Sequence, residues 1–201
     1  MTFKNIPHGF VDVPIGGDFS SHNGPIYARW HDHHLQLGFR VNERQINPGK
    51  SCHGGMLSFF ADILLSSAAQ YQTDIPRQFL PTISLQMDFM ATAPLGSWLQ
   101  GQADILKVTR NLLFSQALLK ADGQTVLRAS GVFRRGPLLP EHGPDHPGHA
   151  GLCPPQVHRR GSRGGPQRGR GAGGGSAGGA GTGRGRGASD RSGSGAAGGS
   201  R

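Results

Sequence analysis

The chain has 201 residues, of which 35% are hydrophobic and 34 are glycine, and its formal net charge is +9. All 14 aromatic residues precede Gly136, whereas 22 of the 34 glycines and a net charge of +6 lie in the last 66 residues. These values exclude a uniformly globular chain, a transmembrane helix, which needs about 20 apolar residues, and a disulfide framework, since only Cys52 and Cys153 occur. No secretory signal pattern opens the chain, and we expect a cytoplasmic protein.

The first 34 residues are rich in Gly, Pro, Asn and His and predict an irregular lead-in, with a short strand at Pro25–Ala28 as a candidate element. We place the folded domain at residues 20–137, so that residues 1–19 precede it. A regular strand is first indicated over residues 35–41, where apolar and polar residues alternate. The following N-P-G-K-S run, residues 47–51, predicts a loop.

A long apolar segment, residues 56–69, follows His53-Gly54-Gly55 and is apolar on nearly every side. It predicts a helix that the rest of the domain wraps. Further along the chain, patterns of period two and an Asp122-Gly123 turn predict strands over residues 82–89, 98–108, 112–119 and 126–135. We therefore predict an α+β fold in which an antiparallel sheet curls around one long central helix.

The end of the chain differs in composition from the rest. From Gly136 on, Leu, Ile, Val and Phe together number only four, so we expect residues 138–201 to form a disordered, basic, low-complexity tail. Its Arg-Gly pairs are similar to those of RNA-binding segments, but it has no aromatic residue to stack on bases. We expect only non-specific, charge-based binding of nucleic acid. An out-of-frame extension of a GC-rich gene is an alternative origin for this tail.

Asp62 is the most informative residue, because an ionised carboxylate within the apolar helix loses solvation unless something compensates it. One interpretation places Asp62 on a solvated stripe with Ser58 and Ser66, one turn before and after it. The interpretation that we favour makes Asp62 a reactive carboxylate in a largely apolar cleft.

Gly54 and Gly55 open the same helix and leave backbone N–H groups approachable where the helix dipole is positive, so that they can polarise a carbonyl oxygen. Eight residues separate Gly54 from Asp62, which is about 12 Å along one helix. That separation is too large for both to act on one reacting atom. If both act on one carbonyl, they must come from two subunits of a two-fold dimer.

The run from Asn47 to Gly55, followed by Asp62, resembles the N-x-x-G-x-x-H-G-G-x(6)-D motif of hotdog-fold acyl-CoA thioesterases of the PaaI type, in the 4-hydroxybenzoyl-CoA thioesterase superfamily. The resemblance extends over about residues 24–133. It implies a hotdog fold, a homodimer or homotetramer, and hydrolysis of an acyl-CoA thioester without a metal or another cofactor.

The resemblance also implies roles for individual residues. Asp62 would activate water or attack the carbonyl. The amide of Gly54 or Gly55 and the side chain of Asn47 would polarise that carbonyl. His53 would position the loop, and Thr82 would orient the carboxylate or the water. Taken alone, Asn47 is an ordinary turn residue and Thr82 an ordinary strand residue on a polar face.

Other candidates have ordinary explanations. The run from His31 to His34 contains zinc-ligand residue types, but adjacent residues of an extended segment point to opposite faces, so we predict no metal site there. Cys52 is predicted to be a packed thiol, because no base can be assigned to it. Basic side chains could steer the phosphates of coenzyme A, without any one of them being assigned as a ligand; these are Lys107, Arg110, Arg128, Arg134 and Arg135.

Two alternatives to an enzyme remain open. The first is a non-catalytic acyl-CoA-binding module on the same fold, against which the presence of Asp62 argues. The second is a nucleic-acid-associated protein that acts through the tail, against which the lack of aromatic residues argues. The acyl-chain preference does not follow from the sequence.

Overall fold

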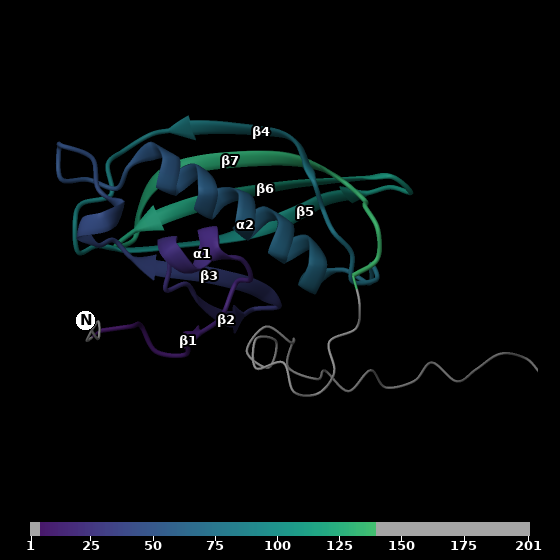
Figure 1. The fold of residues 1–201 in the computed structure, drawn as a ribbon, viewed down its shortest axis with the longest axis horizontal. Helices are drawn as coiled ribbons and strands as arrows, with labels where there is room; N and C mark the ends of the chain where they lie inside the picture. The colour runs from purple at the N-terminus through teal and green to yellow at the C-terminus, as the bar shows by residue number, and fades with distance from the viewer. Residues whose placement is uncertain (1–4, 140–201) are drawn as a thin grey trace, which may run out of the picture. The chain divides into compact units, whose positions relative to one another are not determined.

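A computed structural model describes residues 5–139 (Figure 1). The tail expected from residue 138 onward lies outside these residues except for its first two positions. The described elements are, in chain order, β1 Val11–Asp12, α1 Asp18–Asn23, β2 Tyr27–His31, β3 His34–Arg40, the 3₁₀ helix η1 Glu43–Gln45, α2 Gly54–Gln72, β4 Thr82–Phe89, β5 Trp98–Val108, β6 Leu112–Ala121 and β7 Gln124–Arg134.

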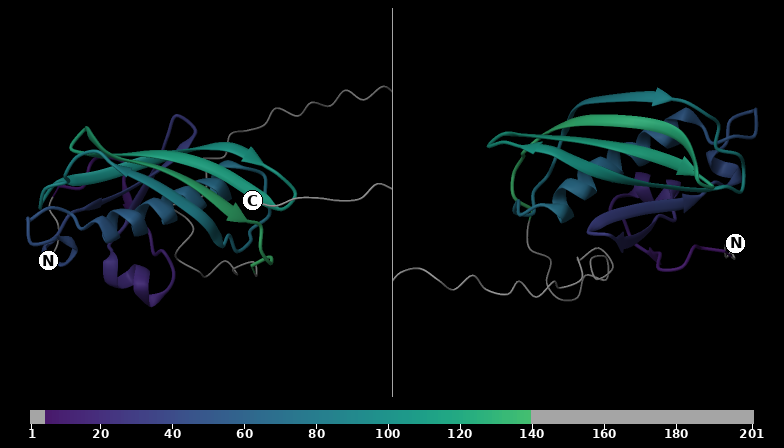
Figure 2. Two further views of the ribbon diagram at one scale, coloured as in Figure 1. Left: turned by 90° about the horizontal axis from the view of Figure 1, so that it is seen from above. Right: turned by 180° about the vertical axis from the view of Figure 1, so that it is seen from behind.

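The seven strands form one antiparallel sheet in the order β1-β2-β3-β5-β6-β7-β4. The sheet curves around α2, which lies across its inner face (Figures 1 and 2). β4 follows α2 in the chain and pairs with β7, so it forms one edge of the sheet. This is the predicted α+β arrangement of a sheet around one long central helix.

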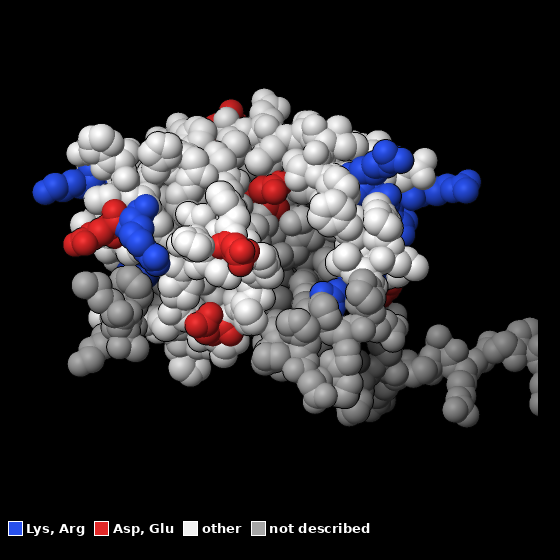
Figure 3. Space-filling model, in the orientation of Figure 1, with Lys and Arg blue, Asp and Glu red and all other residues white. Residues whose placement is uncertain are grey.

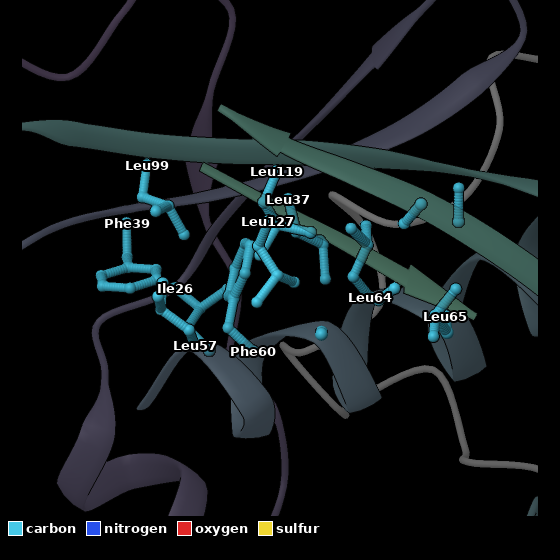
Figure 4. Close-up of a cluster of buried hydrophobic side chains, with 14 of the residues drawn as sticks. Ile26, Leu37, Phe39, Leu57, Phe60, Leu64, Leu65, Leu99, Leu119 and Leu127 are labelled. Atoms are coloured by element: carbon cyan, nitrogen blue, oxygen red, sulfur yellow. The ribbon is translucent and has the colours of Figure 1, made fainter. Parts of the chain in front are cut away.

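The core lies between α2 and the sheet (Figure 4). One face of α2 is buried, with residues three and four apart as an amphipathic helix requires: Met56, Leu57, Phe60, Ala61, Leu64, Leu65, Ala68 and Ala69. The Phe60 ring meets the Phe39 ring of β3 edge to face, with centroids 4.9 Å apart. The opposite face of α2 is only half-buried within the single chain. The domain was expected to cover α2 on most sides, but the single chain buries only one face of it fully.

Two strand glycines allow α2 to approach the sheet closely. A Cβ atom on Gly101 of β5 would lie 2.7 Å from Cδ2 of Leu64, and one on Gly131 of β7 would lie 2.6 Å from the Phe133 ring and 3.1 Å from Cδ1 of Leu65. Leu64, Leu65 and Phe133 are fully buried and cannot move aside without disturbing the core.

We expect Gly131→Ala to lower the free energy of unfolding by about 1–3 kcal/mol, because the added methyl group overpacks the Phe133 ring. Thermal unfolding of the purified variant measures this effect. Gly16→Ala is the matched control, since nothing lies within 4 Å of a Cβ atom at that position. Equal midpoints for the two variants would contradict the close packing of Gly131 against the Phe133 ring and Leu65.

The segment expected to be irregular is more ordered than predicted. β1 lies before residue 20 and pairs with β2, and Phe10 and Val13 on either side of β1 are buried. The histidine-rich run is a tight hairpin between β2 and β3, in which Asp32 and His33 both have positive φ angles (45° and 64°). Such a turn matches the twist of antiparallel strands, but Asp-His is a weak sequence signal for it.

Two further findings concern residues 5–139 alone. No group of three or more His, Cys, Asp or Glu side chains in this part of the chain could hold a metal ion. None of its helices is both long enough and apolar enough to cross a membrane.

Candidate active site

The loop before α2 is closed by Asn47. Its Oδ1 atom accepts hydrogen bonds from the N–H and O–H groups of Ser51 (3.3 and 3.2 Å), and its carbonyl oxygen accepts from the Lys50 N–H (2.9 Å). Lys50 occupies the glycine position of the motif and has a φ angle of +56°, a conformation that favours glycine. Asn47 therefore holds the loop, as an ordinary turn residue does. Its Oδ1 is used in these bonds, and Nδ2 is the hydrogen-bond donor of the same side chain.

His53 is the N-cap of α2. Its Nδ1 atom accepts a hydrogen bond from the Gly55 N–H (2.9 Å), and its carbonyl oxygen accepts from Met56 and Leu57 (2.9 and 3.1 Å). The His53 N–H donates to the carbonyl oxygen of the buried Gln45 (2.7 Å). These bonds fix the start of the helix and occupy the Gly55 N–H.

The N–H group of Gly54 differs from that of Gly55, since within residues 5–139 no acceptor receives it. A Cβ atom on Gly54 would lie 3.5 Å from the Phe89 ring. Phe89 ends β4 and is 54% exposed, so an aromatic ring flanks this donor. The alternating pattern predicts only that Phe89 lies in a strand. It does not indicate that Phe89 lies near the start of the helix.

Asp62 lies in the middle of α2, half-buried on the face that turns away from the core. The Thr82 O–H donates to its Oδ1 atom at 2.7 Å. Ser58 and Ser66, the expected neighbours on a solvated stripe, donate instead to the backbone carbonyls of Gly54 (2.8 Å) and Asp62 (2.9 Å). The structure therefore joins the carboxylate to Thr82 rather than to either serine.

A bulge in β4 brings Thr82 to this carboxylate. Thr82 pairs with Phe133 and Ser84 with Val132, so β4 has one extra residue, Ile83, at this point. Ser84 shares the outer face of the sheet with the alternating residues that follow it, whereas Thr82 faces the helix. A bulge of this kind re-aims one side chain, and strict alternation would have left Thr82 on the outer, polar face.

The predicted site residues thus form two groups within one chain. Asn47, His53, Gly54 and Gly55 lie at the start of α2, and Asp62 with Thr82 lies at its middle. α2 is one continuous helix from Gly54 to Gln72, so the two groups are separated by about 12 Å along its axis. A single chain does not bring them to one reacting atom.

Two surface depressions lie on other parts of residues 5–139. One of about 120 Å³ is lined by the segment 12–15 and by residues around Gly24, and one of about 230 Å³ is lined by outer-face residues of the sheet such as Gln36, Gln102 and Lys120. Neither contains Asp62 or Gly54. The carboxylate is half-buried on the face of α2 that turns away from the core.

Cys52 precedes the N-cap but is buried, and this burial raises the pKa of its thiol to about 12. The thiol is therefore protonated at neutral pH and is a poor nucleophile. The prediction of a packed thiol is confirmed.

We expect Cys52→Ala to retain the activity of the parent, and Cys52 in a Cys153→Ser background to react slowly with iodoacetamide at neutral pH. Above pH 9 the unfolded thiol loses its proton while the folded one keeps it up to about pH 12, so the parent loses stability there. Unfolding of both proteins across this range measures the effect, with a smaller alkaline loss expected for Cys52→Ala. Rapid labelling of the folded chain would contradict the packed thiol.

An antiparallel sheet curved around one long helix is the arrangement of the hotdog fold. The family model described as "Thioesterase superfamily" matches residues 49–127. A curated relative from Pseudomonas aeruginosa, "Putative esterase PA0474", is 32% identical over 130 residues, which cover 64% of this chain and 96% of the relative. The chain belongs to the thioesterase superfamily.

Solved structures agree in fold. A mutant of the phenylacetic acid degradation protein PaaI from Thermus thermophilus is similar, with a TM-score of 0.51 and 17% identity, over 59% of this chain and 99% of that chain. The Escherichia coli PaaI protein has a TM-score of 0.51 and 19% identity, over 61% of this chain and 88% of that chain. The predicted PaaI-like hotdog fold is confirmed. Membership of the thioesterase superfamily supports thioester hydrolysis as the general activity.

Proposed function

We propose that the protein hydrolyses acyl-CoA thioesters with Asp62 as the reacting carboxylate. The observation that carries this proposal is the 2.7 Å bond from Thr82 to Oδ1 of Asp62 on the open face of α2. That bond fixes the orientation of the carboxylate and leaves its second oxygen, Oδ2, for a water molecule or the substrate. A base held in this way suits general-base or nucleophilic catalysis.

The reaction needs a carboxylate, a water molecule and an N–H donor for the oxyanion. Asp62 takes a proton from water as the new C–O bond forms, the carbonyl oxygen gains negative charge, and the C–S bond then breaks to release coenzyme A, whose sulfur receives the proton. Alternatively an Asp62 oxygen attacks the carbonyl carbon, and the C–S bond breaks to release coenzyme A as a thiolate. Water then hydrolyses the mixed anhydride to the free acid and the Asp62 carboxylate, and the proton released goes to the thiolate. In both routes the Gly54 N–H, at the positive end of α2, stabilises the oxyanion.

Gly54 serves this role better than Gly55, because the Gly55 N–H already donates to His53. Asn47 would add its Nδ2 as a second donor, since its Oδ1 is used within the loop. His53 acts as a positioning residue that fixes the geometry of the helix start.

Two subunits would complete each site. The helix start of one chain must meet Asp62 of another, because about 12 Å separate the two on one helix. β4 supplies an edge for such an assembly, since Ile83, Phe89 and Met90 are 57%, 54% and 53% exposed in the single chain. An exposed apolar edge strand favours pairing with a second copy. A dimer, alone or within a tetramer, with antiparallel α2 helices would contain two such sites.

Turnover of a panel of acyl-CoAs tests the proposal, with free thiol release followed by a colour reagent. We expect release of coenzyme A from at least one member of the panel. Tight acyl-CoA binding without turnover would instead identify a non-catalytic binding module. This assay does not test two separate predictions, namely a cytoplasmic location and non-specific binding of nucleic acid by the tail.

A further inference from the structure

We infer that Phe19 of α1 and Phe59 of α2 form the wall that selects the acyl group of the substrate, and that they favour a short, uncharged acyl group over a long chain. This inference rests on the proposed function, because it takes Asp62 as the place where the thioester carbonyl lies. The two residues are called the aromatic pair below.

The aromatic pair lies beside the carboxylate. Phe59 precedes Asp62 by three residues on α2, so the two side chains are neighbours on one face of the helix, about 4.5 Å apart along its axis. The Phe19 ring meets the Phe59 ring edge to face, with centroids 5.0 Å apart and an interplanar angle of 82°. An acyl group that leaves Asp62 in this direction meets both rings within about one helical turn.

α1 packs on the side of α2 that faces away from the sheet (Figure 2, left). It has no buried residue, and Phe19 is 68% exposed. Its last residue is held by the Gln45 side chain, which donates to the carbonyl oxygen of Asn23 (2.7 Å). Its N-cap, Gly17, makes no side-chain capping bond. Core packing thus does not account for the large aromatic side chain at position 19.

Charge decides which part of the substrate takes this side. Asp18 is adjacent to Phe19, and the middle of this face carries acidic side chains, with Lys and Arg lying toward either end (Figure 3). The phosphates of coenzyme A are repelled from such a surface. The uncharged acyl part is therefore the part that contacts the aromatic pair. A ring or short chain fits between Asp62 and the Phe19 ring, whereas Phe19 blocks a long chain.

Substitutions at position 19 in both directions test this inference, with kcat/KM measured for butyryl-, octanoyl- and lauroyl-CoA. Phe19→Ala opens the wall and should raise the ratio of lauroyl to butyryl kcat/KM by about tenfold, in the range that pocket contacts contribute to specificity. Phe19→Trp should lower the same ratio, and Phe59→Ala should raise it. Leu118→Ala is the control, because Leu118 is exposed and lines the depression on the outer face of the sheet.

The outcomes separate the two proposals. If the parent is active and the ratio stays within about twofold of the parent value in both Phe19 variants, the aromatic pair does not select the acyl group, and the proposed function stands. If the parent hydrolyses no acyl-CoA of the wider panel, both proposals are wrong. Because Phe19 is mostly exposed, an unchanged thermal midpoint is expected for Phe19→Ala.

Discussion

Replacing Asp62 with asparagine is expected to lower kcat by about 10²- to 10⁴-fold, the usual effect of losing a catalytic base. The amide keeps the shape of the carboxylate, and its oxygen can still accept the hydrogen bond from Thr82. The variant should therefore remain folded, with the thermal midpoint and oligomeric state of the parent. The measurement is steady-state hydrolysis of the best acyl-CoA found in the panel.

Asp104→Asn is the matched control for this experiment. Asp104 is an exposed carboxylate of β5 whose Oδ1 atom lies 3.5 Å from Nε2 of His34, and it has no part in the proposed site. Its variant should keep the activity of the parent. If Asp62→Asn stays within about threefold of the parent, Asp62 is a solvated helix residue and the proposed mechanism is wrong.

Mixed dimers are expected to recover activity that neither parent variant has. Gly54→Val places a branched side chain beside the Phe89 ring and over the open N–H group, since even a Cβ atom at that position lies 3.5 Å from the ring. Asp62→Asn removes the carboxylate. In a heterodimer of the two, one shared site carries both defects and the other has an intact Gly54 from one chain and an intact Asp62 from its partner. Each heterodimer should then show about half the parent activity.

Co-expression with two affinity tags isolates the heterodimer for this measurement, and each homodimer of a single variant provides the baseline. Folded, verified heterodimers that remain as inactive as the homodimers would show that the site is not shared. A monomeric parent in solution would lead to the same conclusion.

Much of the fold could be predicted because its central strands alternate over most of their length, with register shifts at Ile105–Lys107 and at Leu119–Lys120. The pattern over residues 98–108 predicts β5 with its observed bounds, and the apolar run after His53 predicts α2. The N-terminal elements escaped prediction because β1 has two residues and α1 has six, too few for a period to be recognised. Their order comes from pairing with β2 and from contacts with α2, which no local pattern records.

The site was predictable only as a set of residue types. The sequence could not decide between the amides of Gly54 and Gly55, because that choice depends on which one His53 accepts from. It also placed Thr82 on a polar face by alternation, and only the bulge reverses this. The aromatic pair could not be foreseen, since 40 residues separate Phe19 from Phe59.

The extra residue in β4 has a consequence for how relatives of this protein are aligned and altered. Matching apolar residue to apolar residue along this strand shifts position 82 by one place, so the threonine would be paired with the wrong residue of a relative that has an uninterrupted strand. Deleting Ile83 would restore regular pairing with β7 and leave Thr82 opposite the buried Phe133, on the helix side, because adjacent strand residues face opposite sides of a sheet. The bond from Thr82 to Asp62 therefore depends on the register of Thr82 with Phe133, independently of which side chain occupies position 83.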